Sequence, residues 1–451
     1  MQDDPSAMRF EDPGIKALFT QDARWQSWID VEVALAQAEA ELGMIPADAA
    51  RVIAEHGQLA LLDQERITQG LLRTGHPLVP LIWEFSRVVG EEAGGYVHWG
   101  ATTQNIIDTG EALLLRQAHR ILLRQLGELL NALANLAERS KDMIIPGRTH
   151  GQHAVPATFG YKVAVWIDEL VRNVERLREL EKRVFAAMLG GAAGTFASFG
   201  EQGFKVQTRL AELLDLAPMP VPSRTHRDRQ AEYVTAMALL AGACGKIAFE
   251  VYTMMKQEFG EVEEPVPAGT VGSSTMPQKR NPILSQDVMS GSAYIRSLVP
   301  LALEAILTEH EANRATTTMM RHALEPACVQ MGDNLARLSM IANGIELKPE
   351  RMRRNVDLSG GMILAEAIML KLGENLGRQE AHDVIYDIAQ AVSVDGGAFD
   401  ERLMRNPEVQ AAMSAEELNA MLDPVKYTGL CATMAVEQAA VARRVGNALR
   451  D

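Results

Sequence analysis

The segment 272–282 gathers hydroxyl, ammonium, guanidinium and carboxamide side chains within eleven residues, Gly-Ser-Ser-Thr-Met-Pro-Gln-Lys-Arg-Asn-Pro. The run 264–270 before it is broken by proline and glycine and cannot form a helix. The residue pattern of 283–309 predicts a long helix, with Pro282 at its first turn. The composition therefore predicts a mobile loop that leads into a helix N-terminus, where backbone N–H groups favour an anion. A solvated turn is the alternative.

Two more segments carry side chains that suit acid–base chemistry or anion binding. Residues 98–105 read His-Trp-Gly-Ala-Thr-Thr-Gln-Asn, and residues 147–153 read Gly-Arg-Thr-His-Gly-Gln-His. Histidine is a common general acid, so His150 is a candidate for that role, and a structural histidine is the alternative. His153 follows at a spacing that a metal pair could use. No carboxylate or cysteine supports that pair, so we predict no metal site.

Length and composition exclude several classes of protein. A chain of 451 residues exceeds one ordinary core and predicts two or three domains, and 47% hydrophobic residues exclude a largely disordered protein. A net charge of −15 argues against a nucleic-acid binder, although a local basic cluster could still bind an anionic substrate. Three distant cysteines, with no signal peptide or membrane-spanning run recognised, lead us to expect a soluble, cytoplasmic protein without membrane partners.

Helical periodicity dominates the chain. Helices are predicted at about 21–43, 110–140, 157–187, 229–260, 283–309 and 325–344. Long helices with matching apolar faces predict a bundle, and their length suggests that they also bury surface against other subunits. We expect an N-terminal helical domain at 1–108, a central bundle domain at 109–355 and a small C-terminal helical domain at 356–451.

The segment 272–282 closely resembles the signature of the fumarase/aspartase superfamily, Gly-Ser-Ser-x-Met-Pro-x-Lys-x-Asn-Pro, at every fixed position. Segments 98–105 and 147–153 match two further family segments in the expected order, so the resemblance covers nearly the whole chain. It implies an all-α, three-domain fold that assembles into a homotetramer with a twenty-helix core. It also implies active sites built from three subunits. We expect no cofactor.

The resemblance also implies a reaction. Family enzymes cleave a C–N or C–O bond beta to a carboxylate, usually releasing fumarate, through a carbanion stabilised as an aci-carboxylate. By motif position, Ser273 matches the catalytic base and His150 the group that protonates or orients the leaving group. A serine base requires nearby positive charge and backbone donors. The remaining motif positions are expected to bind substrate: Thr102, Thr103, Thr149, Ser274, Lys279 and Asn281.

Three residues outside those segments, and His98 at the start of segment 98–105, have weaker matches. His76 falls where adenylosuccinate lyases carry another catalytic histidine, although its neighbours differ. His98 either faces the pocket or is a buried structural histidine. Arg229, in the run Arg227-Asp228-Arg229, either orients substrate or joins an ion-pair network between subunits. Arg321 keeps the spacing of a further family arginine.

Several reactions fit the pattern. Segments 353–358 and 422–427 look most like 3-carboxy-cis,cis-muconate cycloisomerases, which often carry Trp at the position of His150. Ala312, Asn313 and Ala315 replace polar residues of adenylosuccinate lyases. We therefore predict a fumarate-releasing lyase acting on an N-substituted aspartate or a related succinyl compound. The alternatives are the cycloisomerase, adenylosuccinate lyase, and a non-catalytic structural relic or helical scaffold.

Overall fold

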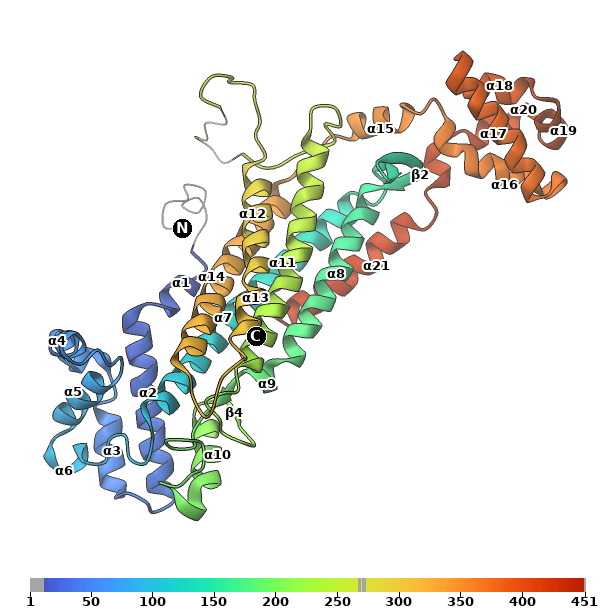
Figure 1. The fold of residues 1–451 in the computed structure, drawn as a ribbon. Helices are drawn as coiled ribbons and strands as arrows, with labels where there is room; N and C mark the ends of the chain where they lie inside the picture. Colours follow the sequence, from blue (N-terminus) through green and yellow to red (C-terminus); the bar gives the residue numbers. More distant parts are fainter. Residues whose placement is uncertain (1–11, 267–268, 270–272, 450–451) are drawn as a thin grey trace. The chain divides into compact units, whose positions relative to one another are not determined.

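A computed structural model describes residues 12–266, 269 and 273–449 (Figure 1). The expectation of an all-α fold built on long helices is confirmed, because strands form only short two-stranded pairs among the described residues. The long helices are α7 (Thr103–Arg139), α8 (Phe159–Glu179), α11 (Asp228–Met255), α12 (Ile283–Ser297) and α14 (Arg314–Gly344).

Proline explains where one predicted helix differs from the structure. The helix expected at 283–309 is divided at Leu298 into α12 and α13 (Val299–Glu304), and Pro300 lies in the first turn of α13, where its missing N–H is tolerated. In contrast, Pro326 lies inside α14, which begins at Arg314 and is longer than the helix expected at 325–344. The helix expected at 157–187 ends at Glu179 and is followed by the short α9 (Glu181–Val184).

The chain forms two compact units, and all five long helices contribute residues to both. The first unit comprises the described residues up to Gln125, with Asn173–Cys244 and Ser290–Ala336. The second comprises Leu126–Arg172, the described residues of Gly245–Met289, and those from Arg337 onward. The division into three domains at 108 and 355 stays a prediction.

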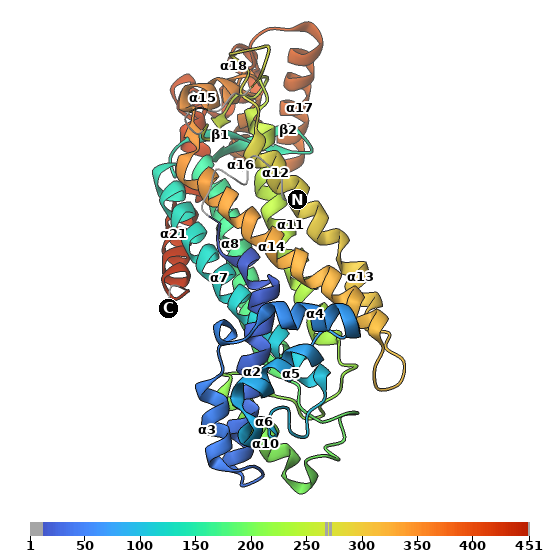
Figure 2. The ribbon, with the colours of Figure 1, turned by 90° about the vertical axis from the view of Figure 1, so that its left-hand side faces the viewer.

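The first unit contains the N-terminal helices and one short parallel strand pair. Its further elements are α1 (Ile15–Leu18), α2 (Gln21–Glu41), α3 (Ala47–Glu55), α4 (Gln64–Thr74), α5 (Val79–Val89), α6 (Glu91–Gly94), β3 (Ala186–Ala187), α10 (Gly203–Leu213) and β4 (Ala217–Pro218). Helix α2 packs against α3 and α10 (Figure 2). It also approaches α7 closely at Gly110, where a Cβ atom would lie 2.6 Å from the Trp28 ring.

The second unit contains two antiparallel strand pairs and the C-terminal helices. Its further elements are β1 (Ile144–Thr149), β2 (Gln152–Thr158), β5 (Val262–Glu263), β6 (Glu346–Leu347), α15 (Pro349–Asp357), α16 (Ala365–Leu376), α17 (Arg378–Asp395), α18 (Phe399–Arg405), α19 (Pro407–Ala412), α20 (Ala415–Met421) and α21 (Cys431–Asn447). Helices α16 to α20 share a hydrophobic core that includes Ile368, Phe399 and Leu418.

Helix α11 is the most membrane-like of the described helices by length and composition. Among the described helices it alone has the length and mean hydropathy that a membrane crossing would require. Half of that apolar window is buried inside the protein, as expected for a helix of a bundle core.

Two glutamates of α2 are buried among its apolar residues. Glu39 is fully buried, and neither of its carboxylate oxygens has a hydrogen-bond partner among the described residues. Glu32, two turns earlier on the same helix, is 2% exposed. Burial, reinforced by the charge of Glu32, raises the pKa of Glu39 to about 9, so this side chain is neutral at pH 7.

We predict that Glu39→Gln makes the protein more stable relative to the wild type as the pH rises from 5 to 8. In the unfolded wild type the carboxyl loses its proton above its ordinary pKa of 4.5, whereas the folded protein holds the proton up to about pH 9. The folded state therefore binds more protons in this window, and its stability falls with rising pH. Melting temperatures at several pH values measure the effect. Glu175→Gln, at an exposed position of α8, is the control, and a difference between Glu39→Gln and wild type that does not change with pH would contradict the prediction.

Candidate active site

The predicted site residues fall into two groups, one in each unit. The first unit holds His76, His98, Thr102, Thr103, Arg229 and Arg321, and the second holds Thr149, His150, Ser273, Ser274, Lys279 and Asn281. Gly272, the first residue of the signature segment, lies outside the described residues.

A cationic pocket of about 570 Å³ lies in the first unit. We call it the Arg321 pocket. It is formed by the turn between α4 and α5, the start of α7, the loop before α11 and the start of α14. The polar and charged residues that line it are His76, Thr103, Gln104, Arg224, Arg227, Asn313, Arg314, Thr317, Thr318 and Arg321. No carboxylate is among its lining residues within the described chain, so it suits a small anionic ligand.

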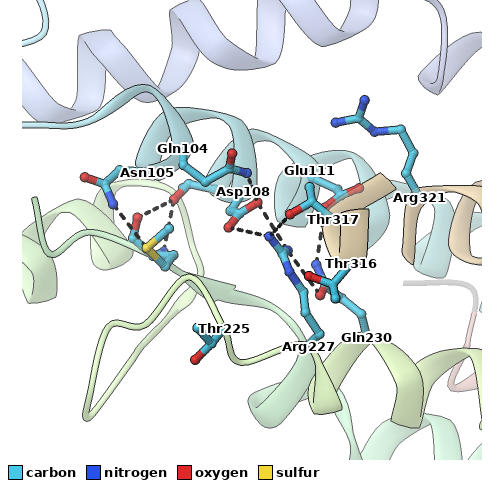
Figure 3. A network of polar contacts seen from close by, with 12 residues as sticks. Gln104, Asn105, Asp108, Glu111, Thr225, Arg227, Gln230, Thr316, Thr317 and Arg321 are labelled. Carbon is cyan, nitrogen blue, oxygen red and sulfur yellow. Dashed lines mark hydrogen bonds and ion pairs between the residues drawn. The ribbon is translucent and has the colours of Figure 1, made fainter. Parts of the chain in front are cut away.

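Arg227 is the most tightly held cation of this pocket (Figure 3). It is 3% exposed, and its two terminal nitrogens each donate a hydrogen bond of 3.3 Å to one oxygen of Asp108. It also donates to Thr317 Oγ1 at 3.0 Å, while Gln104 Nε2 donates to Asp108 Oδ1 at 2.6 Å. These contacts join the start of α7, the start of α11 and α14. The sequence motif points to Arg229, whereas the structure places Arg227 in the pocket lining. Spacing along the chain does not show which of the two arginines faces the pocket.

Glu111 lies one turn after Asp108 on α7, beside Arg227 and its partners (Figure 3). Among these groups, Glu111 is the one with a pKa near neutrality. It accepts a hydrogen bond of 3.2 Å from Gln230 Nε2. Burial and the charge of Asp108 raise the pKa of Glu111 to about 7, against the opposing effect of Arg227 and Arg321. The net charge behind the pocket therefore changes within the physiological pH range.

Polar side chains fix the start of α7, which begins at Thr103, directly after Thr102. The Thr102 N–H donates to Asn105 Oδ1 at 3.0 Å. Thr109 and the backbone of Met188 exchange two hydrogen bonds, at 3.0 and 3.2 Å. Thr103, the first residue of α7, lines the Arg321 pocket, and a helix N-terminus at this place favours an anion.

His76 has a structural role as well as a place in the Arg321 pocket. Its Nδ1 atom accepts backbone N–H bonds from Leu78 at 3.3 Å and Val79 at 3.2 Å, which caps the start of α5. A neutral His76 ring therefore carries its proton on Nε2, and only this atom remains for a ligand.

His98 is held by a buried carboxylate. Its Nδ1 lies 2.7 Å from Glu32 Oε1, and Glu32 is 2% exposed. The His98 backbone adopts a φ of 65°, and Gly100 follows with a φ of 68°. Ser198 Oγ donates to the Gly100 carbonyl at 2.5 Å. Glu32 and Ser198 thus stabilise an unusual turn directly before Thr102.

Arg229 and Arg321 differ in their surroundings. Arg229 is not among the residues that line the Arg321 pocket. Its Nε and Nη1 are buried and have no hydrogen-bond partner among the described residues, and burial lowers its pKa. Arg321 lines the pocket, with its Nε 3.6 Å from Glu325 Oε1. Arg24 occupies the other oxygen of Glu325 at 2.6 Å, so Arg321 is only loosely bound.

In the second unit, Thr149 and His150 lie at the tip of the β1–β2 hairpin. His150 and Gly151 form the two-residue turn between the paired residues Thr149 and Gln152, with φ angles of 53° and 77°. Two successive residues with positive φ are typical of the tight turns that match strand twist. The turn leaves the His150 side chain exposed to solvent.

A buried ion pair anchors this hairpin next to its turn. Arg148 donates to both oxygens of Glu261, at 2.5 and 3.1 Å, and Glu261 is fully buried. Asn355 Nδ2 also donates to Glu261, at 2.7 Å. The Arg148 guanidinium lies 5.0 Å from the centre of the Phe259 ring, so it is held by charge and by stacking. His150 is therefore two residues from a rigid attachment point.

The signature segment folds around the Ser273 hydroxyl. Ser273 Oγ accepts backbone N–H bonds from Met276 at 3.1 Å and Thr275 at 3.4 Å. Ser274 and Lys279 are exposed, and the Lys279 N–H donates to the Met276 carbonyl at 3.0 Å. Asn281 is half-buried, and its carbonyl accepts the N–H of Ile283 at 2.9 Å.

The first amides of α12 are not free to bind an anion, contrary to the expectation from sequence. Glu264, which is 3% exposed, accepts N–H bonds from Leu284 at 2.8 Å and Ser285 at 3.0 Å. It also accepts the Ser285 hydroxyl at 2.7 Å. The Gln286 N–H donates to the Pro282 carbonyl. The carboxylate of Glu264 thus occupies the N-terminus of α12, where we expected a substrate anion to bind.

Metal ligation finds no support in the described part of the chain. Within it, no three His, Cys, Asp or Glu side chains are grouped so that they could hold a metal ion. His153 pairs with Arg148 across the hairpin. Burial and the charge of Arg148 lower the His153 pKa.

Known proteins resemble this chain over nearly its whole length. Residues 8–296 match the protein family described as Lyase, and residues 361–437 match the family described as adenylosuccinate lyase C-terminus. The N-acetyl-S-(2-succino)cysteine lyase of Dickeya dadantii is 37% identical over 93% of this chain and 92% of its own length. The 3-carboxy-cis,cis-muconate cycloisomerase of Pseudomonas aeruginosa is 37% identical over 92% and 91%. The crystal structure of a fumarate lyase from a Mesorhizobium species matches with a TM-score of 0.89 at 34% identity, covering 95% of this chain and 98% of that one.

We predict that Glu264→Gln loosens the start of α12. An amide in place of the carboxylate keeps one acceptor oxygen and loses the charge, so the loss in stability should be about 1–3 kcal/mol. Hydrogen exchange of the Leu284 and Ser285 amides should become faster. Glu263→Gln is the matched control, because Glu263 binds Lys348 and Arg280 instead. Unchanged exchange at both amides in Glu264→Gln would show that the cap does not hold this helix.

Proposed function

This chain belongs to the fumarase/aspartase superfamily, and on that premise we propose that it releases fumarate from an N-substituted aspartate or a related succinyl compound. Relatives that match 93% and 94% of this chain are lyases by name, which supports a lyase reaction. The proposed reaction is a beta-elimination in which Ser273 removes a proton from carbon and His150 assists the leaving group.

The hydrogen bonding of Ser273 is the observation that carries this proposal. A serine hydroxyl becomes a base only if its alkoxide is stabilised. The N–H groups of Thr275 and Met276 already point at Ser273 Oγ, so they would hold the negative charge of the alkoxide. Lys279, six residues later in the same segment, adds a positive charge to this loop.

The Arg321 pocket supplies the second requirement, which is binding of an anionic substrate. Thr103 and the start of α7 would bind one carboxylate of the substrate, and Arg321, which is only loosely paired, would bind another. Arg227 would act mainly through its fixed charge, because Asp108 and Thr317 already occupy its terminal nitrogens.

The atom that leaves need not be nitrogen. The Dickeya dadantii relative acts, by its name, on a compound in which sulfur carries the succinyl group. We therefore include thioethers of succinate among the candidate substrates. A thiolate leaves with less help than an amine, because a thiol has a pKa near 8.5. The effect of replacing His150 would therefore be large for an amine adduct and small for a thioether.

The cycloisomerase is the second candidate, and the 37% identity to the Pseudomonas aeruginosa enzyme favours it. Such a reaction adds an internal carboxylate to a double bond and has no leaving group to protonate. His150 would then be a binding residue. The match of 361–437 to adenylosuccinate lyase leaves that activity as a third candidate, although Ala312 and Asn313 replace polar residues of that branch beside the pocket.

The two groups of site residues suggest how a complete site is assembled. As the family resemblance implies, we propose a homotetramer in which different subunits contribute the two groups to each site. We also propose that the enzyme acts in the cytoplasm without a cofactor or metal. Sedimentation at micromolar concentration tests the assembly, and a stable monomer would rule out shared sites.

We predict that Ser273→Ala reduces turnover by about 10²–10⁴-fold while leaving the fold and the assembly unchanged. Thr275→Ala removes a hydroxyl from the same loop but keeps the N–H that donates to Ser273, so it should retain most activity. Ultraviolet absorbance of the carbon–carbon double bond measures turnover.

The substrate panel would contain adenylosuccinate, argininosuccinate, N-substituted aspartates, N-acetyl-S-(2-succino)cysteine and 3-carboxy-cis,cis-muconate. Fumarate released from a succinyl adduct supports the lyase proposal and names the leaving group. Consumption of the muconate without fumarate would establish the cycloisomerase instead. Equal activity of Ser273→Ala and wild type on the substrate that is turned over would exclude Ser273 as the base.

A further inference from the structure

A second basic pocket lies in the first unit and shares no residue with the Arg321 pocket. It has a volume of about 540 Å³, and we call it the α7–α9 pocket. It is lined by Arg116, His119, Arg120, Leu123, Arg178, Glu181, Lys182, Phe185, Asp215, Leu216 and Ala217. Neither the sequence motifs nor the proposed reaction uses any of these residues.

Helical spacing explains how the pocket forms. Arg116, His119, Arg120 and Leu123 recur at intervals of three and four on one face of α7. The end of α8 and the short α9 supply further charged residues, and the loop between α10 and β4 closes the pocket with Asp215. The charged groups are four cations, at positions 116, 120, 178 and 182, and two carboxylates, at positions 181 and 215.

The floor of the pocket is polar but fully paired. His119 is 2% exposed, with Nδ1 3.2 Å from the Tyr233 hydroxyl and Nε2 3.2 Å from Glu181 Oε1. Burial lowers the His119 pKa and raises that of Tyr233, so the hydroxyl donates to Nδ1 and the neutral ring donates from Nε2 to Glu181. Glu181 also accepts from Arg178 at 3.0 Å. His119, Glu181 and Arg178 are therefore satisfied without a ligand.

The rim of the pocket is different, because two arginines share one exposed carboxylate oxygen. Asp215 Oδ2 lies 3.0 Å from Arg116 Nη1 and 2.9 Å from Arg120 Nη2. The Asp215 side chain is 77% exposed, whereas that of Arg116 is only 16% exposed. Nε and Nη1 of Arg116 are buried and have no partner in hydrogen-bond geometry among the described residues. The buried cation is thus incompletely satisfied by the acid that lies beside it.

We propose that the α7–α9 pocket binds a small anion bearing phosphate or carboxylate groups, and that Asp215 is an internal competitor which this ligand displaces. An ion pair with a carboxylate as exposed as that of Asp215 contributes little to stability, so its displacement is easy. Two arginines and Lys182 then face the anion, and planar guanidinium groups bind phosphate and carboxylate oxygens in pairs. The volume exceeds that of inorganic phosphate and accommodates an organic anion.

Two substitutions with opposite expected effects test this proposal. Asp215→Asn removes the competing charge, and asparagine, like aspartate, tolerates the φ of 53° at this position, so the loop keeps its conformation. It should bind inorganic phosphate several-fold more tightly than the wild type. Arg120→Ala removes an exposed cation of the rim and should bind phosphate at least fivefold more weakly.

Thermal shift at rising phosphate concentration measures these affinities, because a ligand that binds the folded state raises the melting temperature. Sodium chloride at equal ionic strength corrects for screening. Arg124→Ala, an exposed arginine one turn after Arg120 that does not line the pocket, is the matched control and should behave as the wild type. Phosphate binding at the Arg321 pocket is common to all four proteins and cancels in the comparison.

Succinate in place of phosphate identifies the ligand chemistry. The same order of affinities with both anions indicates a general site for small anions, and a response to one of them identifies the preferred group. The proposal is wrong if Asp215→Asn binds both anions no more tightly than the wild type, or if Arg120→Ala binds them as the wild type does. Circular dichroism on each variant verifies that the fold is retained. This test does not require the enzyme to be active, so it is independent of the proposed reaction.

Discussion

Three carboxylates within the four residues 261–264 hold the functional segments of the second unit. The Glu261 side chain binds Arg148 and so fixes the hairpin that carries His150. Glu263 binds Lys348 and Arg280, the latter within the signature segment. Glu264 caps α12, at the end of that segment. Glu263 lies in the short strand β5, and Glu261 and Glu264 flank it, so this stretch contacts both the hairpin and the signature segment.

The same principle operates in the first unit, with the charges reversed. There a buried arginine, Arg227, is held by Asp108, and the pocket beside it keeps further arginines for a ligand. A chain with a net charge of −15 therefore still forms a basic pocket, because its acids pair with some arginines and leave others less satisfied. The α7–α9 pocket has this arrangement too, but there the pairing acid is exposed.

Two candidate histidines occupy backbone conformations that most residues avoid. His98 and His150 have φ angles of 65° and 53°. Each of these turns lies next to a buried acidic partner, Glu32 for His98 and, through Arg148, Glu261 for His150. Unusual backbone geometry persists where the surroundings fix it, and it commonly marks functional sites. Both turns are therefore held by contacts that are remote in sequence.

The sequence by itself determined the superfamily, the all-α class and the approximate positions of the long helices. These features are local, because a signature is contiguous and an apolar stripe repeats every three or four residues. The tertiary structure decided which polar groups are available to a ligand. In the folded chain the first amides of α12 donate to Glu264, which lies 20 residues upstream of Leu284. Arg227 is held at the pocket by Asp108, which is 119 residues away in the sequence. Hydrogen-bond partners at such separations are brought together only by folding, so no local pattern reveals them.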